Sequence, residues 1–154
     1  MPDLKPSKVL LVDDEYLALD LLEEFLRQLP QASLVAKCKS AMEAMTVLQG
    51  QEVDVMFLDV QMPSLSGIDF LKGLHAPPAT VFTTAYRDFA VDAFELRATD
   101  YLVKPFSFAR FARSFIIYKI FLPRFARSFY YLQNSQKSQG GFLRRGGVLI
   151  QTPW

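Results

Sequence analysis

Cysteine is almost absent from this sequence of 154 residues, in which Cys38 is the single example. One cysteine excludes a disulfide scaffold and a four-cysteine zinc site. Long apolar runs are also missing: residues 115–122 come nearest, but Lys119 interrupts them and Pro123 follows, whereas about 18 residues are needed to cross a bilayer. The start of the chain lacks the apolar stretch of a signal peptide. We therefore expect a cytoplasmic protein that makes no contact with a membrane.

Acidic residues are missing from the last third of the chain. All 16 Asp and Glu lie in residues 1–104, which carry a net charge of −7, while residues 105–154 hold eight basic residues and no acid. Hydrophobic residues make up 51% of the sequence, which is enough for a buried core and excludes a disordered or collagen-like chain. The length suits one domain with a short extension. The charge split predicts a cation-binding part followed by a basic tail.

Short apolar runs recur along the acidic part of the chain. They predict five strands, at residues 8–12, 34–36, 53–58, 79–82 and 101–103. Runs that are apolar throughout are typical of strands buried on both faces, as in parallel sheets. With right-handed crossovers, the sequence predicts an α/β fold with a doubly wound, five-stranded parallel sheet and helices on both faces.

The segments between these strands have the periodicity of helices. Apolar residues recur at helical spacing over residues 17–29, and the capping box of Ser40 and Glu43 opens a second helix. A short helix follows Gly67, and a last helix begins near Phe106. In the helix before the fifth strand, we expect the inward-facing side chains to be Ala90, Val91, Phe94 and Leu96.

Polar side chains stand where four of the predicted strands end. Asp13 and Asp14 follow the first strand, Asp59 ends the third, Thr84 the fourth and Lys104 the fifth. Ligands of open parallel sheets bind at the carboxyl ends of the strands, so we expect these side chains to converge. Three close carboxylates repel one another, and at least one would stay protonated without a cation. With Mg²⁺, a lysine and a hydroxyl donor, they would form a site for a phosphoryl group on an aspartate.

Each of these residues has a simpler interpretation when it is taken alone. An Asp-Asp pair after a strand is often a helix N-cap, and Asp59 fits a turn. Thr84 fits the cap of the next helix, a role for which Thr83 competes, and Lys104 fits a surface lysine. Their joint occurrence at four strand ends favours the functional interpretation.

Four short motifs cover these positions: VDDE at residues 12–15, DVQMP at 59–63 with Gly67, TA at 84–85 and YLVKPF at 101–106. Together they resemble the receiver domain of two-component response regulators, over residues 7–115. FTTAY at 82–86 and ATDYLVKPFS at 98–107 are most similar to the LytR/AlgR subgroup of transcriptional regulators, whose LytTR-type output domain binds DNA. The resemblance implies a flavodoxin-like sheet in the order 2-1-3-4-5.

The resemblance also implies a role for each matching residue. Asp59 is expected to take a phosphoryl group from a phosphohistidine of a sensor histidine kinase, without the turnover of an enzyme. Asp14 would bind Mg²⁺ directly, Asp13 partly through water. The complete set of metal ligands would be the carboxylates of Asp13, Asp14 and Asp59 and the backbone carbonyl of Gln61.

Three further residues would respond to the phosphoryl group in a protein of this family. Lys104 would pair with it, and its bond to Pro105 is expected to be cis. Thr84 would donate a hydrogen bond to a phosphoryl oxygen. Tyr101 would turn inward as a switch and change the surface of the fourth helix, fifth strand and fifth helix, although an aromatic residue on a strand usually belongs to the core.

The basic tail departs from this pattern. The hexapeptide RFARSF at residues 110–115 recurs unchanged at residues 124–129, which indicates an internal duplication. We expect a receiver at residues 7–122 and a basic tail at residues 123–154, where residues 133–141 read as a linker and residues 142–154 as the possible start of a truncated output domain. Either copy could form the last receiver helix. The other would expose apolar residues, which favours a homodimer or an exchanged helix.

Two other functions compete with the signalling interpretation. A Mg²⁺-dependent phosphohydrolase with an aspartate nucleophile needs an acid two residues after that nucleophile, but Gln61 occupies this position. A DNA-binding regulator that acts through the tail would rely on phosphate contacts of the basic residues. Sequence-specific DNA binding needs a complete output domain, which is much longer than this tail.

Overall fold

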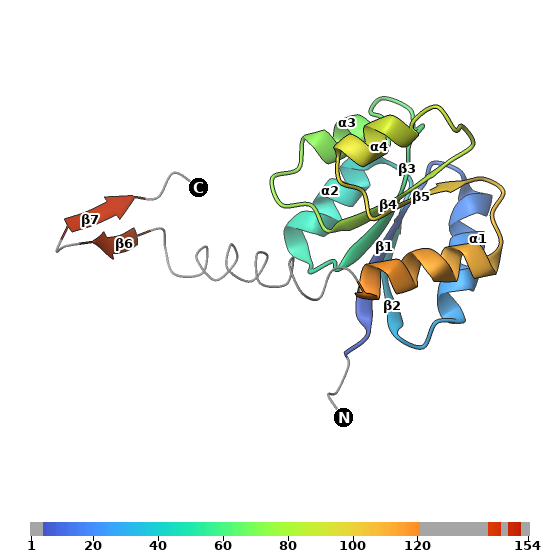
Figure 1. Ribbon diagram of the computed structural model, residues 1–154, viewed down its shortest axis with the longest axis horizontal. Helices are drawn as coiled ribbons and strands as arrows, with labels where there is room; N and C mark the ends of the chain where they lie inside the picture. Colours follow the sequence, from blue (N-terminus) through green and yellow to red (C-terminus); the bar gives the residue numbers. More distant parts are fainter. Residues whose placement is uncertain (1–4, 121–141, 146–147, 152–154) are drawn as a thin grey trace. The chain divides into compact units, whose positions relative to one another are not determined.

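The computed structural model describes residues 5–120, 142–145 and 148–151. It divides into two compact units, Met1–Tyr118 and Lys119–Trp154, which are considered separately. Five strands form one parallel sheet in the order β2-β1-β3-β4-β5 (Figure 1). Their bounds are β1 Ser7–Val12, β2 Ala32–Cys38, β3 Val55–Asp59, β4 Ala79–Thr84 and β5 Asp100–Val103. The predicted fold class and strand order are confirmed.

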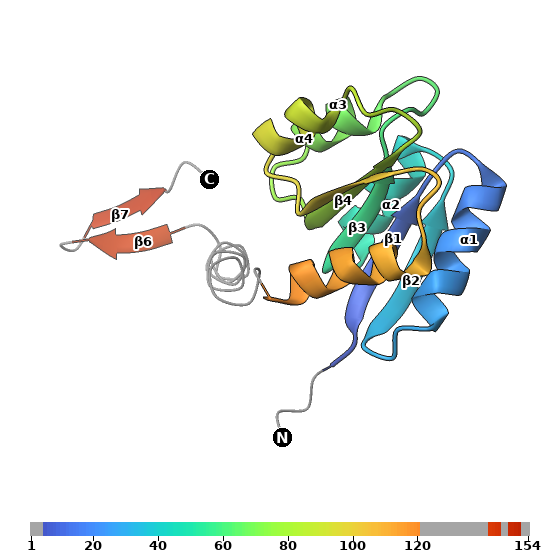
Figure 2. The same cartoon turned by 45° about the vertical axis from the view of Figure 1, so that its right-hand side comes forward.

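Helices cover both faces of this sheet. Four of them are α1 Tyr16–Arg27, α2 Ala41–Gly50, α3 Gly67–Lys72 and α4 Ala90–Glu95, and residues 108–120 are also helical. α1 and the helix of residues 108–120 lie on one face, and α2, α3 and α4 lie on the other (Figures 1 and 2). The predicted capping box forms at α2, where the Ser40 hydroxyl accepts a hydrogen bond from the Glu43 amide at 3.2 Å.

Alternate residues of the central strands build a core on each side of the sheet, because successive side chains of a strand point to opposite faces. Toward α2, α3 and α4, β1 and β3 contribute fully or almost fully buried residues that include Leu10, Val12, Met56 and Leu58. Toward the other face, Phe57 stacks on Phe111 with 4.7 Å between the ring centroids. The sheet is therefore buried on both sides, as its continuous apolar strands predict.

The inward face of α4 differs from the prediction. Val91 and Phe94 are 68% and 84% exposed, whereas Ala93 is buried. Phe89, just before the helix, and Leu96, just after it, pack on the core on either side of Ala93. Positions 89, 93 and 96 follow the i, i+4, i+7 spacing of one helical face. The prediction for Leu96 was correct. The prediction for Ala90, Val91 and Phe94 was wrong, because these three residues are exposed to solvent.

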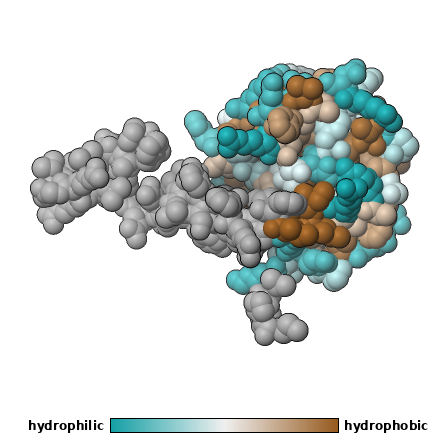
Figure 3. All heavy atoms as spheres, viewed as in Figure 1, coloured by the Kyte–Doolittle hydropathy of each residue, from teal (hydrophilic) through white to brown (hydrophobic). Residues whose placement is uncertain are grey.

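Further apolar side chains are exposed on the opposite layer. On α1, Leu19, Leu22 and Leu26 are buried, but Leu17 is 80% exposed. Hydrophobic atoms also gather on the surface over the helix of residues 108–120 (Figure 3), where Ile116 and Ile120 are 52% and 63% exposed.

The second unit contains a small antiparallel sheet. Strands β6 Phe142–Arg145 and β7 Val148–Gln151 pair with each other. The second RFARSF copy and the predicted linker at residues 133–141 lie outside the described residues. None of the described helices has both the length and the apolar character needed to cross a membrane.

Candidate functional site

The carboxyl ends of β1, β3, β4 and β5 lie side by side because the strands are parallel and in register. Val12 pairs with Leu58, Asp59 with Thr83, and Thr84 with Val103. The residues that end or follow these strands are therefore brought to one edge of the sheet. The convergence expected from the sequence is present.

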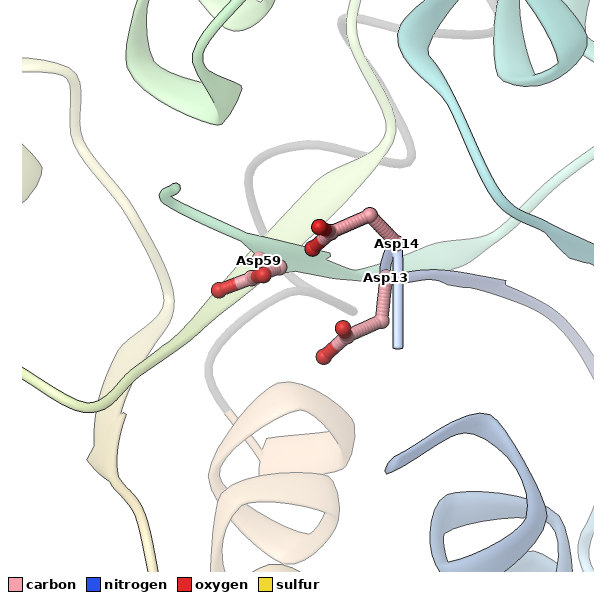
Figure 4. A group of neighbouring side chains, drawn as sticks. All are labelled: Asp13, Asp14 and Asp59. Carbon is pink, nitrogen blue, oxygen red and sulfur yellow. The ribbon is translucent and has the colours of Figure 1, made fainter. Parts of the chain in front are cut away.

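Three carboxylates gather at this edge. One oxygen from each of Asp13, Asp14 and Asp59 lies within 4.8 Å of the others, and Figure 4 shows the three side chains beside one another at the strand ends. Asp13 is fully buried and Asp59 is 4% exposed. An arrangement of hard oxygen ligands with limited access to water suits a divalent cation such as Mg²⁺.

Lys104 supplies the positive charge of the site. Its Nζ donates a hydrogen bond to Asp13 Oδ2 at 2.7 Å and lies 3.7 Å from Asp59 Oδ1. Burial acts to lower the pKa of Lys104, but its hydrogen bond to Asp13 and the charges of Asp59 and Asp13 raise this pKa overall. Lys104 therefore stays protonated between two of the three carboxylates. Its bond to Pro105 is cis, as expected.

Asp59 is the most strongly perturbed acid of the cluster. Burial, followed by the negative charge of Asp13, raises the pKa of Asp59 from its ordinary value of 3.8 to about 7, although the charge of Lys104 acts in the opposite direction. A carboxyl group with this pKa is partly protonated near neutral pH. A cation at the cluster would favour its charged, nucleophilic form.

The turn after β3 is fixed by a very close backbone approach at Gly67. A Cβ atom there would lie 2.0 Å from the backbone oxygen of Asp59, and the Gly67 amide donates to the Val60 carbonyl at 2.8 Å. Only glycine fits this contact without a shift of the backbone. The sequence marked Gly67 as a loop residue of a motif, but its contact with Asp59 required coordinates.

Thr84 and Tyr101 are linked through the loop that follows β4. The buried Thr84 hydroxyl accepts a hydrogen bond from the Tyr86 amide at 3.1 Å, and the Tyr101 hydroxyl donates to the Tyr86 carbonyl. Thr83 is also buried, but its hydroxyl has no hydrogen-bond partner among the described residues. Of the two candidate threonines, Thr84 is thus the one that contacts the loop.

The structural roles considered for single site residues, as caps or turn residues, apply to some of them. Asp13 Oδ1 accepts a hydrogen bond from the Glu15 amide at 2.9 Å, so Asp13 also stabilises the turn into α1. Thr84 shapes the loop but does not cap α4, whose N-cap residue is Phe89. Gln61 is exposed, and the metal contact of its backbone carbonyl stays a prediction.

Known proteins resemble this chain over the same residues. The response regulator receiver domain matches residues 9–115. The transcriptional regulatory protein BtsR of Escherichia coli is 41% identical over 109 residues, which are 70% of this chain and 46% of BtsR. The sensory transduction protein LytT of Bacillus anthracis is 37% identical over 115 residues, or 73% of this chain and 47% of LytT.

Among solved structures, the response regulatory domain of protein mrkE from Klebsiella pneumoniae is 34% identical, with a TM-score of 0.65. The match covers 70% of this chain and 90% of that domain. The chain spans about half the length of the curated relatives it matches. The similarity to LytT and BtsR confirms the predicted resemblance to LytR/AlgR-type regulators. The chain belongs to the response regulator receiver domain family.

Proposed function

We propose that this receiver accepts a phosphoryl group on Asp59 from the phosphohistidine of a sensor histidine kinase and carries the signal of a two-component system. One observation carries the proposal: three carboxylates and Lys104, from three separate strand ends, meet at one edge of the sheet. A purely structural role would leave an excess of negative charge in this cluster, because Lys104 offsets only part of the charge of the three carboxylates.

The cluster fits a Mg²⁺ ion held by Asp13, Asp14 and Asp59, with the Gln61 carbonyl as a further ligand. The three side chains offer hard oxygen atoms within 4.8 Å of one another, which is the chemistry that Mg²⁺ prefers. When bound, the ion would neutralise charge on the transferring oxygens.

The residues of the site have complementary roles in the transfer. An Asp59 carboxylate oxygen attacks the phosphorus atom, the bond between phosphorus and the imidazole nitrogen breaks, and its electron pair stays on the imidazole. Lys104 lies 3.7 Å from Asp59 and is placed to pair with the phosphoryl oxygens as they approach. The protein positions the reactants and stabilises charge, which is its main contribution to phosphoryl transfer.

The signal leaves the site through Thr84 and Tyr101. A phosphoryl oxygen on Asp59 would attract the Thr84 hydroxyl, which contacts the Tyr86 amide in the structure. The same loop residue holds the Tyr101 hydroxyl through its carbonyl. A movement of this loop would change the position of Tyr101 and the surface of α4 and β5, which is how a local charge becomes a change in packing.

The domain organisation, location and partners of this receiver are inferred from the family. We place the receiver at residues 7–122, followed by a basic tail at residues 123–154, in a cytoplasmic transcriptional regulator. A second RFARSF copy outside the last receiver helix would add apolar residues, and we propose a homodimer on that basis. Specific DNA binding is proposed only for a protein with a complete output domain. No observation favours the phosphohydrolase alternative, because Gln61 is not an acid.

Treatment with acetyl phosphate or phosphoramidate and Mg²⁺ tests the proposal. We expect a mass gain of one phosphoryl group that is labile in base. The gain should be absent in Asp59→Asn and reduced in Lys104→Ala. It should persist in Asp69→Asn, the matched control, because Asp69 is an exposed acid on α3. Modification that survives in Asp59→Asn would contradict the proposal.

A further inference from the structure

An open cavity of about 640 Å³ lies between the turn that follows β3 and the short helix α4. Much of its lining is apolar: Val60, Met62 and Ile68 are buried, and Phe89, the N-cap residue of α4, is half-buried. The cavity shares Gln61 with the proposed Mg²⁺ site but contains none of its three carboxylates. Its size and composition are those of small-molecule sites, which are concave and mostly apolar with a few polar groups.

Backbone hydrogen bonds hold both walls of this cavity in place. In the turn after β3, the Gly67 amide donates to the Val60 carbonyl at 2.8 Å. In α4, the Ala93 amide donates to the Phe89 carbonyl at 3.0 Å. A site whose walls are already ordered loses less conformational entropy when a ligand binds.

Asp92 brings a negative charge to this apolar lining. It is half-buried, and its carboxylate has no hydrogen bond and no ion pair within the part of the chain that the structure describes. No lysine or arginine among the described residues lines the cavity. A carboxylate that is partly removed from water without a partner is unfavourable, so a cation that enters the cavity would gain from pairing with it. The other acid of the lining, Asp69, is exposed and remains hydrated.

Phe89 adds an aromatic ring beside this carboxylate. It precedes Asp92 by three positions, which is the spacing of neighbours on a helix surface, and its ring meets that of Tyr86 edge to face, with the centroids 6.5 Å apart. Aromatic faces attract cations. A hard ion such as Mg²⁺ prefers several oxygen ligands and water, and it would leave the apolar lining wet. The lining therefore favours a cation that carries an apolar body.

We propose that this cavity binds a small organic cation, in which a protonated amine or a guanidinium group pairs with Asp92 and an apolar body packs on Met62, Ile68 and Phe89. The cavity volume is in the range of sites for small molecules. A bound ligand would join the turn that follows Asp59 to α4, whose surface the proposed switch changes, and would so bias that switch. The binding itself does not depend on the phosphoryl chemistry proposed for Asp59.

An NMR titration of the full, nitrogen-15-labelled chain with phenethylamine tests the proposal, with Mg²⁺ in excess so that the amine does not compete for the carboxylate cluster. We expect saturable shifts of the amide signals of residues 60–69 and 89–92, which line the cavity. Phenethyl alcohol has nearly the same shape but no charge, and it should bind about tenfold more weakly. Equal binding of the two compounds, or shifts centred on Asp13 and Asp14, would overturn the proposal.

Variants of the lining identify the group that holds the cation. Asp92→Asn should weaken the binding of phenethylamine about tenfold and affect that of phenethyl alcohol little, while Phe89→Leu should weaken the binding of phenethylamine about threefold. Asp69→Asn is the matched control, because its carboxylate is exposed. Equal losses in Asp92→Asn and Asp69→Asn, or no loss in Asp92→Asn, would overturn the pairing with Asp92.

A short blocked peptide with one lysine between alanines distinguishes a free ligand from a segment of another protein. It should bind more weakly than phenethylamine, because it offers no aromatic body for the apolar lining. If the peptide binds more tightly than the amine, and Asp92→Asn abolishes this binding, a protein segment is the occupant and the small-molecule proposal is wrong.

Discussion

The interior of the sheet and its carboxyl edge are built from the same strands, but burial has opposite effects on stability in the two regions. In β3, Phe57 is fully buried against Phe111, and burial of its apolar surface stabilises the fold. Two residues later, burial of Asp59 raises the pKa of its carboxyl group to about 7 and so disfavours the charged form. One strand thus combines a segment whose burial stabilises the fold with an end whose burial acts against stability.

Removal of the Phe57 ring should have the largest effect on stability. Phe57→Ala deletes a fully buried side chain that stacks on Phe111, so we expect a loss of about 4 kcal/mol, measured by urea unfolding. Phe57→Leu is the milder control and should cost less than about 1.5 kcal/mol. A loss for Phe57→Ala no greater than that for Phe57→Leu would show that the interior does not depend on this ring.

Asp59→Asn should increase the stability of the fold, in contrast to the loss expected for Phe57→Ala. The folded-state pKa of Asp59, about 7, lies above its ordinary value of 3.8, so the folded protein binds this proton more tightly than the unfolded chain. The resulting stability is complete below about pH 4 and is lost as the pH rises through about 7. In the absence of Mg²⁺, Asp59→Asn should therefore be more stable than wild type at about pH 8.

This gain should be on the order of 3 kcal/mol at about pH 8 and should vanish at about pH 4. Urea unfolding of both proteins across this range measures the difference. If the difference does not change with pH, or decreases as the pH rises, burial of Asp59 does not act against the fold.

Gly67→Ala should lower the stability of the fold and also disturb the carboxyl edge of the sheet, through one backbone contact. The added methyl group would lie 2.0 Å from the Asp59 backbone oxygen, so we expect a loss of about 2 kcal/mol and slower phosphorylation by acetyl phosphate. Gly50→Ala is the matched control, because a Cβ at Gly50 contacts nothing within 4 Å. Equal stability and equal phosphorylation rates in the two variants would contradict this account.

The adjacent threonines should give the smallest changes in stability and the clearest contrast in function. Thr83→Val removes a buried hydroxyl that lacks a partner among the described residues, so its effect should be neutral or stabilising by about 1 kcal/mol. Thr84→Val removes the acceptor of the Tyr86 amide and should cost about 1 kcal/mol. Only Thr84→Val should weaken the response of the Tyr101 ring signals to phosphorylation in an NMR spectrum, and an equal loss in Thr83→Val would exclude a special role for Thr84.

Much of the fold could be predicted because the relevant signals are local. Continuous apolar runs marked the strands, and the parallel arrangement followed from helices between them. The rule that parallel strands end at one edge then brought Asp13, Asp59 and Lys104 together before any coordinates were known. The face of α4 could not be chosen in this way, because Phe89 lies just outside the helix and competes with Phe94 for the core.

The electrostatics of the site required coordinates. Lys104 and Asp13 are 91 positions apart in the sequence, and their 2.7 Å contact depends on the packing of the whole sheet. The raised pKa of Asp59 depends on its degree of burial, and the closeness of Gly67 depends on the path of one turn. The sequence indicated which residues meet but not which of them is perturbed.

The most direct test of the central claim, that three carboxylates share one cation, is a Mg²⁺ titration of thermal stability at about pH 8. The account predicts that Mg²⁺ raises the Tm of wild type and of Asp69→Asn in a saturable manner and raises that of Asp14→Asn much less. An equal rise in Asp14→Asn, or no rise in wild type, would contradict it.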